Sequence, residues 1–204
     1  MMMLKSNKVI GNYEKPILIN IKNYFEKCGY ISYIHSRLNL AWSKIVSDID
    51  VVAFKNNETI IIEVKSSHDD FYKAFKQLIN ISGYADKLYI ATDKKFNDIS
   101  KVNWVNNDIG LIYVNKEGNI EIIKKAKYIN NVSKNHFIKL KKKCLYELVK
   151  NLNISKKNTK QKMTDILFKH KKINYKKILK LIAFCNFKCT NKCIYDNIFN
   201  KEIT

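Results

Sequence analysis

Residues 47–67, SDIDVVAFKNNETIIIEVKSS, decide the fold of this chain. Two stretches of it, residues 49–54 and 59–64, are rich in Ile and Val, which favour β-strands. Asn56 and Asn57 lie between them, and asparagine tolerates the positive φ angles of a tight hairpin turn. The segment therefore predicts two antiparallel strands joined by a short turn.

The turn determines which residues of the two strands lie opposite each other. A two-residue connection at Asn56 and Asn57 and a four-residue loop over residues 55–58 give the same register. The predicted pairs are Lys55 with Glu58, Phe54 with Thr59, Val52 with Ile61, and Asp50 with Glu63. Because directly opposite residues have Cβ atoms about 4.5–5.5 Å apart, the carboxylates of Asp50 and Glu63 are expected to be neighbours.

Strand alternation gives the hairpin one charged face and one wholly apolar face. The charged face carries Asp48, Asp50, Val52, Phe54, Ile61, Glu63 and Lys65. The apolar face carries Ile49, Val51, Ala53, Ile60, Ile62 and Val64. The charges therefore gather at the end of the hairpin far from the turn, where Asp48 is expected to form a salt bridge with Lys65.

Two adjacent carboxylates favour the binding of a divalent cation. Like charges opposite each other in a sheet are destabilising, and two partly buried carboxylates do not both ionise without compensation. Mg²⁺ would compensate, since it typically takes one or two carboxylates together with substrate phosphates and water. Lys65 could then contact a scissile phosphate and stabilise the negative charge of the transition state. The alternative is a surface hairpin with solvated charges.

The composition predicts a globular protein with a polyanionic partner. A length of 204 residues allows one domain, or one domain with a small appendage. A single Pro, five Gly and 46% hydrophobic residues argue against a disordered chain. The formal charge of +20 predicts attraction to nucleic acid or another polyanion.

A cytoplasmic location without membrane contact is also expected. The first residues lack the long apolar core of a signal peptide, and no apolar run approaches the ~20 residues that span a bilayer. The five cysteines are an odd number, which favours reduced thiols. Cys144, Cys185, Cys189 and Cys193 could form a four-thiolate metal or cluster site. Their spacing is not that of zinc sites, so a helical face of small buried side chains is favoured.

The flanking sequence predicts further helices and strands. Helices are expected over residues 16–28, from Asp69 or Asp70 to about Gly83, and over residues 96–105, with Phe71, Phe75, Leu78, Ile79 and Ser82 lining one side of the second. Strands are expected over residues 30–35, 87–92, 109–114 and 120–123. The order is that of an α/β sandwich.

From about Ser133 the strand signals vanish and lysine-rich helical patterns begin. Phe137, Leu140, Cys144, Leu145, Leu148 and Val149 form one apolar stripe, and further helices are expected over residues 159–170, 174–185 and 191–200. The sequence therefore predicts two domains: residues 1–131, an α/β domain, and residues 132–204, a lysine-rich helical domain that binds nucleic acid or a partner.

Residues 14–92 resemble the PD-(D/E)XK nuclease superfamily, which includes restriction endonucleases and Holliday junction resolvases. The resemblance lies in Asp50 of IDVVAF, in Glu63 and Lys65 of IIIEVK, and in the helix and strand that follow. It implies a restriction-endonuclease-like α-β-β-β-α-β core, with a mixed sheet between helices and a helical C-terminal extension. The Pro that often precedes the first Asp is Ile49 here.

The resemblance also implies roles for individual residues. Asp50 and Glu63 would bind Mg²⁺ or Mn²⁺ with the carbonyl of Val64, and Lys65 would assist catalysis. Gln77 is the candidate for the glutamine that several branches carry in the following helix, with Tyr84 more distant. Glu14 is favoured over Glu26 as the counterpart of the first-helix glutamate. Alternatively, Gln77, Glu14 and Glu26 are ordinary exposed helix residues without a role in the site.

Candidate contacts with nucleic acid flank this motif and recur in the tail. Arg37 ends a strand near the expected cleft, and Ser66 and His68 follow the motif directly. Lys141, Lys142 and Lys143 could track a phosphate backbone or form the solvated face of a helix.

The sequence thus predicts a metal-dependent endonuclease that hydrolyses DNA phosphodiester bonds. The preference for DNA over RNA and the expectation of a homodimer follow from the resemblance alone. Two alternatives stay open: a non-catalytic nucleic-acid-binding protein with this fold, and a partner-binding subunit of a larger complex.

Overall fold

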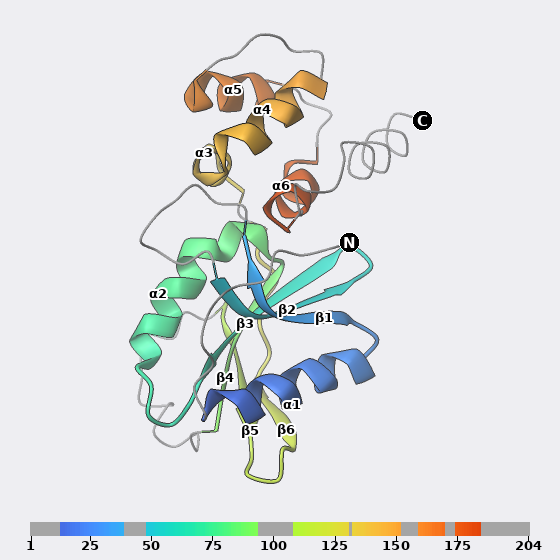
Figure 1. Cartoon of the computed structure of the whole chain (residues 1–204), viewed down its shortest axis with the longest axis vertical. Helices are drawn as coiled ribbons and strands as arrows, with labels where there is room; N and C mark the ends of the chain where they lie inside the picture. Colours follow the sequence, from blue (N-terminus) through green and yellow to red (C-terminus); the bar gives the residue numbers. More distant parts are fainter. Residues whose placement is uncertain are drawn as a thin grey trace. The chain divides into compact units, whose positions relative to one another are not determined.

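The computed structural model describes residues 13–38, 48–93, 108–130, 132–151, 159–169 and 174–184 (Figure 1). These residues fall into two compact units. The sheet unit comprises the described residues of 5–36 and 48–130, and the helical unit comprises residues 37–38 and those described after residue 131. The predicted helices over 96–105 and 191–200 lie outside the described residues.

The sheet unit contains a mixed sheet of six strands in the order β1-β2-β3-β4-β5-β6 (Figure 1). The strands are β1 (Ile31–Arg37), β2 (Asp48–Lys55), β3 (Glu58–Lys65), β4 (Lys87–Thr92), β5 (Gly110–Val114) and β6 (Ile120–Lys124). β2 and β3 are antiparallel, β3, β4 and β5 run parallel, and β6 is antiparallel to β5. With helices α1 (Glu14–Lys27) and α2 (Phe71–Ile81), this order confirms the predicted α-β-β-β-α-β core and its mixed sheet.

Helix α1 covers the apolar face of the hairpin. Ile17, Leu18, Ile21 and Phe25 of α1 form one buried cluster with Val51, Ala53, Ile60, Ile62 and Val64 of the two strands. Burying a side chain of this size stabilises the fold by about 1.5–3 kcal/mol. The predicted division of the hairpin is therefore confirmed, and the face with Asp50 and Glu63 points away from α1.

Helix α2 starts as predicted but buries a different side. The carboxylate of Asp70 accepts a hydrogen bond of 2.8 Å from the backbone N–H of Tyr72 and caps the helix. Its buried residues are Ala74, Leu78 and Ile81, whereas Phe71 and Phe75 are half-buried and Ile79 and Tyr72 are exposed. The predicted stripe of Phe71, Phe75, Leu78, Ile79 and Ser82 therefore coincides only in part with the buried side, and Leu78 is its one buried member. A small residue such as Ala74 lets a helix approach a sheet closely, which propensity and periodicity do not reveal.

The helical unit contains α3 (Lys134–Lys139), α4 (Lys142–Asn151), α5 (Lys160–Leu167) and α6 (Tyr175–Phe184). The apolar stripe predicted from Phe137 to Val149 does not lie on one helix, because Leu140 has an extended backbone (φ −62°, ψ 156°) and ends α3. Leu140 is nevertheless buried, as are Phe137, Leu145 and Val149. The stripe therefore correctly marked core residues but missed the break between two helices.

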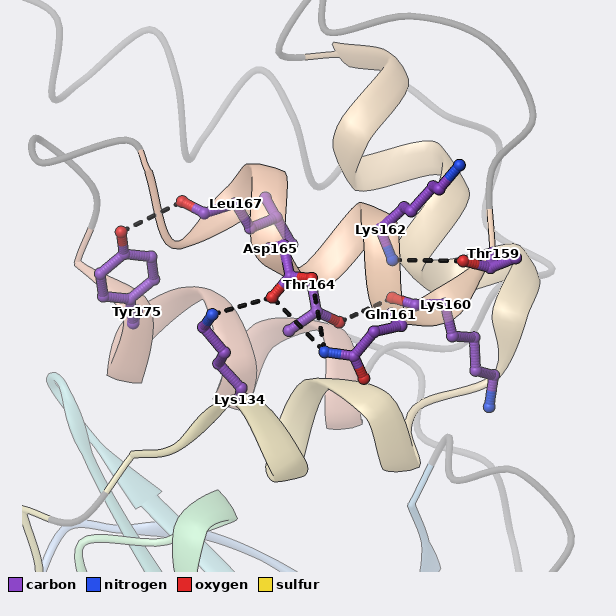
Figure 2. A network of polar contacts seen from close by, with 9 residues as sticks. All are labelled: Lys134, Thr159, Lys160, Gln161, Lys162, Thr164, Asp165, Leu167 and Tyr175. Atoms are coloured by element: carbon purple, nitrogen blue, oxygen red, sulfur yellow. Dashed lines mark hydrogen bonds and ion pairs between the residues drawn. The ribbon is translucent and has the colours of Figure 1, made fainter.

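Polar contacts join the helices of this unit (Figure 2), and aromatic rings pack between them. Lys134 Nζ of α3 lies 2.8 Å from Asp165 Oδ1 of α5, and the hydroxyl of Tyr175 donates a hydrogen bond of 3.1 Å to the carbonyl of Leu167. The rings of Phe168 and Tyr175 are stacked 4.5 Å apart, and the Phe137 ring meets that of Phe168 edge-on. These contacts hold α3, α5 and α6 together around the buried Phe137.

His136 is expected to make the helical unit sensitive to mild acid. Its Nδ1 accepts a hydrogen bond of 3.0 Å from the backbone N–H of Ser133, as part of a capping box at the start of α3. Burial, and next the charges of Lys139 and Lys176, lower the pKa of His136 below its ordinary value of 6.5. Because the folded-state pKa lies below the unfolded-state pKa, the unfolded chain takes up the proton first. The contribution of the neutral His136 side chain to the stability of the fold is therefore complete above pH 6.5. This contribution is lost as the pH falls through the folded-state pKa of His136.

The melting temperature measured by circular dichroism should therefore fall between neutral pH and pH ~5. His136→Gln is the matched control, because glutamine keeps a capping acceptor at this position and does not titrate. The variant should lose a clearly smaller part of its stability over the same pH range. An equal loss in both proteins would contradict the assignment to His136.

Candidate active site

The hairpin that carries the candidate site has the predicted register. β2 and β3 pair Lys55 with Glu58, Phe54 with Thr59, and Val52 with Ile61. The pairing continues to Val51 with Ile62, and one further step along both strands leads to Asp50 and Glu63.

Asp50, Glu63 and Lys65 are buried, with 2%, 1% and 6% of their surface exposed. Lys65 Nζ lies 2.7 Å from Glu63 Oε1, and Asp50 Oδ2 accepts a hydrogen bond of 2.9 Å from the backbone N–H of Val64. Burying an isolated charge is costly, and the ion pair and the hydrogen bond offset part of that cost. The group thus keeps two carboxylates and one ammonium away from bulk water, where each interacts strongly with any bound charge.

The donor atoms of this group suit a hard divalent cation. Mg²⁺ and Mn²⁺ prefer oxygen ligands, and Mg²⁺ usually combines one or two carboxylates with water and substrate phosphates. Asp50 and Glu63 supply the carboxylates, and the carbonyl of Val64 is the expected further oxygen. Within the described parts of the chain, no three His, Cys, Asp or Glu side chains come together as a metal-binding group. A cation held here would therefore depend on water and phosphate for the rest of its shell.

Gln77 and Tyr84 differ in what they offer the site. Gln77 lies on α2, and its Oε1 is buried with no hydrogen-bond partner among the described residues. An unsatisfied buried acceptor is costly and calls for an explanation such as a bound ion or water. Tyr84 is fully buried beyond the end of α2, and this burial raises the pKa of its hydroxyl. Gln77 therefore stays a candidate, whereas Tyr84 has the surroundings of a core residue.

Glu14 lies in the first turn of α1 and is half-buried. Its neighbour Tyr13 contacts the ring of His68, with centroids 5.0 Å apart, so this end of α1 lies beside the loop that follows β3. Glu14 nevertheless does not join Asp50 and Glu63 in a group of three acidic side chains. Glu26, the alternative, forms an ion pair of 2.7 Å with Lys22 on the surface of α1.

The loop after the motif is held by its own hydrogen bonds. Asp69 Oδ2 accepts from both the backbone N–H (2.8 Å) and the hydroxyl (2.6 Å) of Ser66, which is buried. The hydroxyl of Ser66 therefore fixes the loop, and this structural role was not foreseen. His68 is exposed in the same loop, and its contact with nucleic acid stays a prediction.

The remaining predicted contacts lie at an edge strand and in the helical unit. Arg37 is the last residue of β1, and its side chain is not among those described. Lys141, Lys142 and Lys143 are exposed at and just before the start of α4. The suggested thiolate site rests on Cys185, Cys189, Cys193 and the side chain of Cys144, all of which lie outside the described part.

Two further polar groups lie on strands that neighbour the hairpin. No sequence pattern singled out Asp93, whereas His35 ends the strand expected over residues 30–35 and was expected to be able to contact substrate. Asp93 follows β4 directly after Thr92, which pairs with Lys65, and its Oδ1 is buried without a partner among the described residues. His35 of β1 is buried at a positive φ of 49°, and neither ring nitrogen has a hydrogen-bond partner in the described structure. Such strain at a non-glycine residue is common near functional sites. The only signal for Asp93 is an acidic residue at the end of a strand parallel to β3.

Comparisons with known proteins show a family and several similar chains. The profile of the family described as bacteriophage P4 protein cII matches residues 12–204. A UPF0102 protein of Clostridium beijerinckii is 29% identical over 116 residues, which are 56% of this chain and 87% of that protein. The SPO1766 protein of Silicibacter pomeroyi, described as of unknown function, is similar over 61% of this chain and 78% of its own, with 17% identity and a TM-score of 0.45. An XisH family protein from Nostoc punctiforme is similar over 56% of this chain and 99% of its own, with 18% identity and a TM-score of 0.39. Within the described residues, no helix has the length and apolar character needed to cross a membrane.

Proposed function

We propose that this chain, which belongs to the bacteriophage P4 protein cII family, is a divalent-metal-dependent nuclease that hydrolyses DNA phosphodiester bonds. The observation that carries the proposal is the buried group of Asp50, Glu63 and Lys65 at one end of the β2–β3 hairpin. Charged side chains are rarely buried without a purpose, and active sites often collect them. Two carboxylates beside one ammonium are suited to a cation and a phosphate.

Each residue has a distinct role in the proposed reaction. A Mg²⁺ or Mn²⁺ ion held by Asp50, Glu63 and the carbonyl of Val64 would act as a Lewis acid and lower the pKa of a bound water. Lys65 offers positive charge for the negative charge that develops at the scissile phosphate. Its contact of 2.7 Å with Glu63 fixes the ammonium before substrate binds, so little reorganisation is needed.

The charge distribution along the chain supports a nucleic acid as the substrate. Residues 132–204 contain 19 lysines and four acidic residues, and therefore carry 15 of the chain's 20 net positive charges. Exposed lysines of the helical unit, such as Lys141, Lys142 and Lys143, need no rearrangement to meet phosphates. We propose that the helical unit, with Arg37, supplies non-specific affinity. We further propose that His68 lies on the path of the strand near the site, in the loop that Ser66 holds. The preference for DNA and the dimeric state follow the family resemblance and are part of the same proposal.

A cleavage screen tests this function. Duplex, single-stranded and branched DNA are incubated with the protein in Mg²⁺, in Mn²⁺ and in excess chelator, and the products are resolved on denaturing gels. We expect cleavage of at least one substrate with metal and none with chelator. Binding in gel shifts without cleavage in either metal would instead support a non-catalytic nucleic-acid-binding protein. Absence of both would support a partner-binding subunit.

A further inference from the structure

Two exposed aromatic rings are in contact where the start of α1 meets the loop that follows β3. Tyr13, at the start of α1, has 67% of its surface exposed, and the exposed ring of His68 lies 5.0 Å from it between centroids. Tyr72, in the first turn of α2, is also exposed, at 47%. Aromatic rings are large apolar surfaces that folding normally covers, so a group of exposed rings is suited to a ligand.

The backbone that carries these rings is well fixed and close in sequence to the site. His68 is the third residue after Lys65, and its loop is closed by the two hydrogen bonds from Ser66 to Asp69. Tyr72 follows the cap at Asp70, which holds the N-terminus of α2. The rings therefore belong to the loop and the two helix starts that border the end of β3.

Positive charge accompanies the rings. Lys76 Nζ lies 4.2 Å from the centre of the Tyr72 ring, and Lys73, on the intervening turn, is exposed. Exposed rings interleaved with lysines bind single-stranded nucleic acid, because bases stack on the rings while the lysines meet the phosphates. The paired bases inside a duplex are stacked on each other and cannot reach such rings.

We propose that Tyr13, His68 and Tyr72 form a stacking platform for unpaired bases next to the active site, so that the preferred substrate contains single-stranded or splayed DNA. This inference rests on the proposed nuclease function and narrows it to a class of substrate. It makes no use of the metal, which allows it to be tested separately from cleavage.

The test measures binding in excess chelator, with fluorescein-labelled oligothymidylate and with a duplex of the same length. Tyr13→Ala and Tyr72→Ala should each weaken binding of the oligothymidylate by about fivefold or more and change duplex binding by less than about twofold. Tyr13→Trp should restore the affinity, because tryptophan offers a larger ring for stacking. Tyr128→Ala is the matched control, since Tyr128 is a tyrosine of the sheet unit with 60% of its surface exposed. Its binding of oligothymidylate should equal that of the parent.

Some outcomes would overturn the platform whether or not the protein cleaves DNA. These are parental affinity in both Tyr13→Ala and Tyr72→Ala, an equal loss in Tyr128→Ala, or no binding of oligothymidylate by the parent. If the platform variants behave as expected but no substrate is cut, the proposed catalytic function fails and the single-strand site stands. Matching melting temperatures of all variants show that the changes are local.

Discussion

Asp50→Asn and Glu63→Gln are each expected to reduce metal-dependent cleavage of DNA by at least about 100-fold. Either change removes one negative charge from the pair that would hold the cation, while the shape of the side chain is kept. The amide oxygen of asparagine at position 50 can still accept the hydrogen bond of 2.9 Å from the N–H of Val64. The amide oxygen of glutamine at position 63 can still accept from Lys65. The fold should therefore survive both changes, and the loss should be one of chemistry.

Glu58→Gln is the matched control for this prediction. Glu58 lies at the turn end of the same strand β3, where it contacts Lys87 at 2.7 Å and accepts a hydrogen bond of 2.5 Å from the hydroxyl of Tyr30. It is thus an acidic residue of the same hairpin with polar partners of its own, but far along the strand from Lys65. Cleavage by Glu58→Gln should stay within about threefold of the parent. A similar loss in all three variants would indicate a general defect of the hairpin instead of a catalytic site at Asp50 and Glu63.

The hairpin could be predicted from the sequence because its determinants are local. The turn at Asn56 and Asn57 fixes the register, and a period of two residues then assigns every side chain to a face. The side of α2 could not be predicted in the same way. A helix with apolar residues at positions 71, 74, 75, 78, 79 and 81 offers more than one apolar side, and packing on the sheet selects the side with Ala74, Leu78 and Ile81. The extended backbone at Leu140 had no signal, since neither Gly nor Pro is present there.

The same holds for the candidate site: residues of one hairpin could be placed from the sequence, whereas residues that come close only through contacts between distant segments could not. Asp50, Glu63 and Lys65 belong to one hairpin, so their proximity followed from its register. Asp93 comes near Lys65 only because β4 pairs in parallel with β3, and a parallel register has no turn to define it. His35 is distinguished by its positive φ and unpaired ring nitrogens, which are properties of the folded chain alone.

Lys65→Met is expected to destabilise the protein by about 3–5 kcal/mol. The change removes the partner at 2.7 Å from the almost fully buried carboxylate of Glu63, which is then left as an uncompensated charge next to Asp50. The double variant Glu63→Gln with Lys65→Met removes the charge as well and should recover most of this loss. Urea unfolding at neutral pH and low salt, followed by circular dichroism of each variant, measures the difference. If the single variant is as stable as the double variant, the ion pair does not hold the site together.

Added divalent metal should stabilise the parent, Lys65→Met and the double variant to different extents if it binds at the proposed site. A ligand that binds only the folded state stabilises it in proportion to RT ln(1 + [L]/Kd). In Lys65→Met a divalent cation would replace the missing positive charge between Asp50 and Glu63, so Mg²⁺ or Mn²⁺ should raise its unfolding midpoint more than that of the parent. In the double variant one carboxylate is gone, and the same metal should have little effect. Equal stabilisation of all three proteins would mean that the cation binds elsewhere on the chain. Lys65 and the packing of the hairpin would then be sufficient to keep the two carboxylates buried.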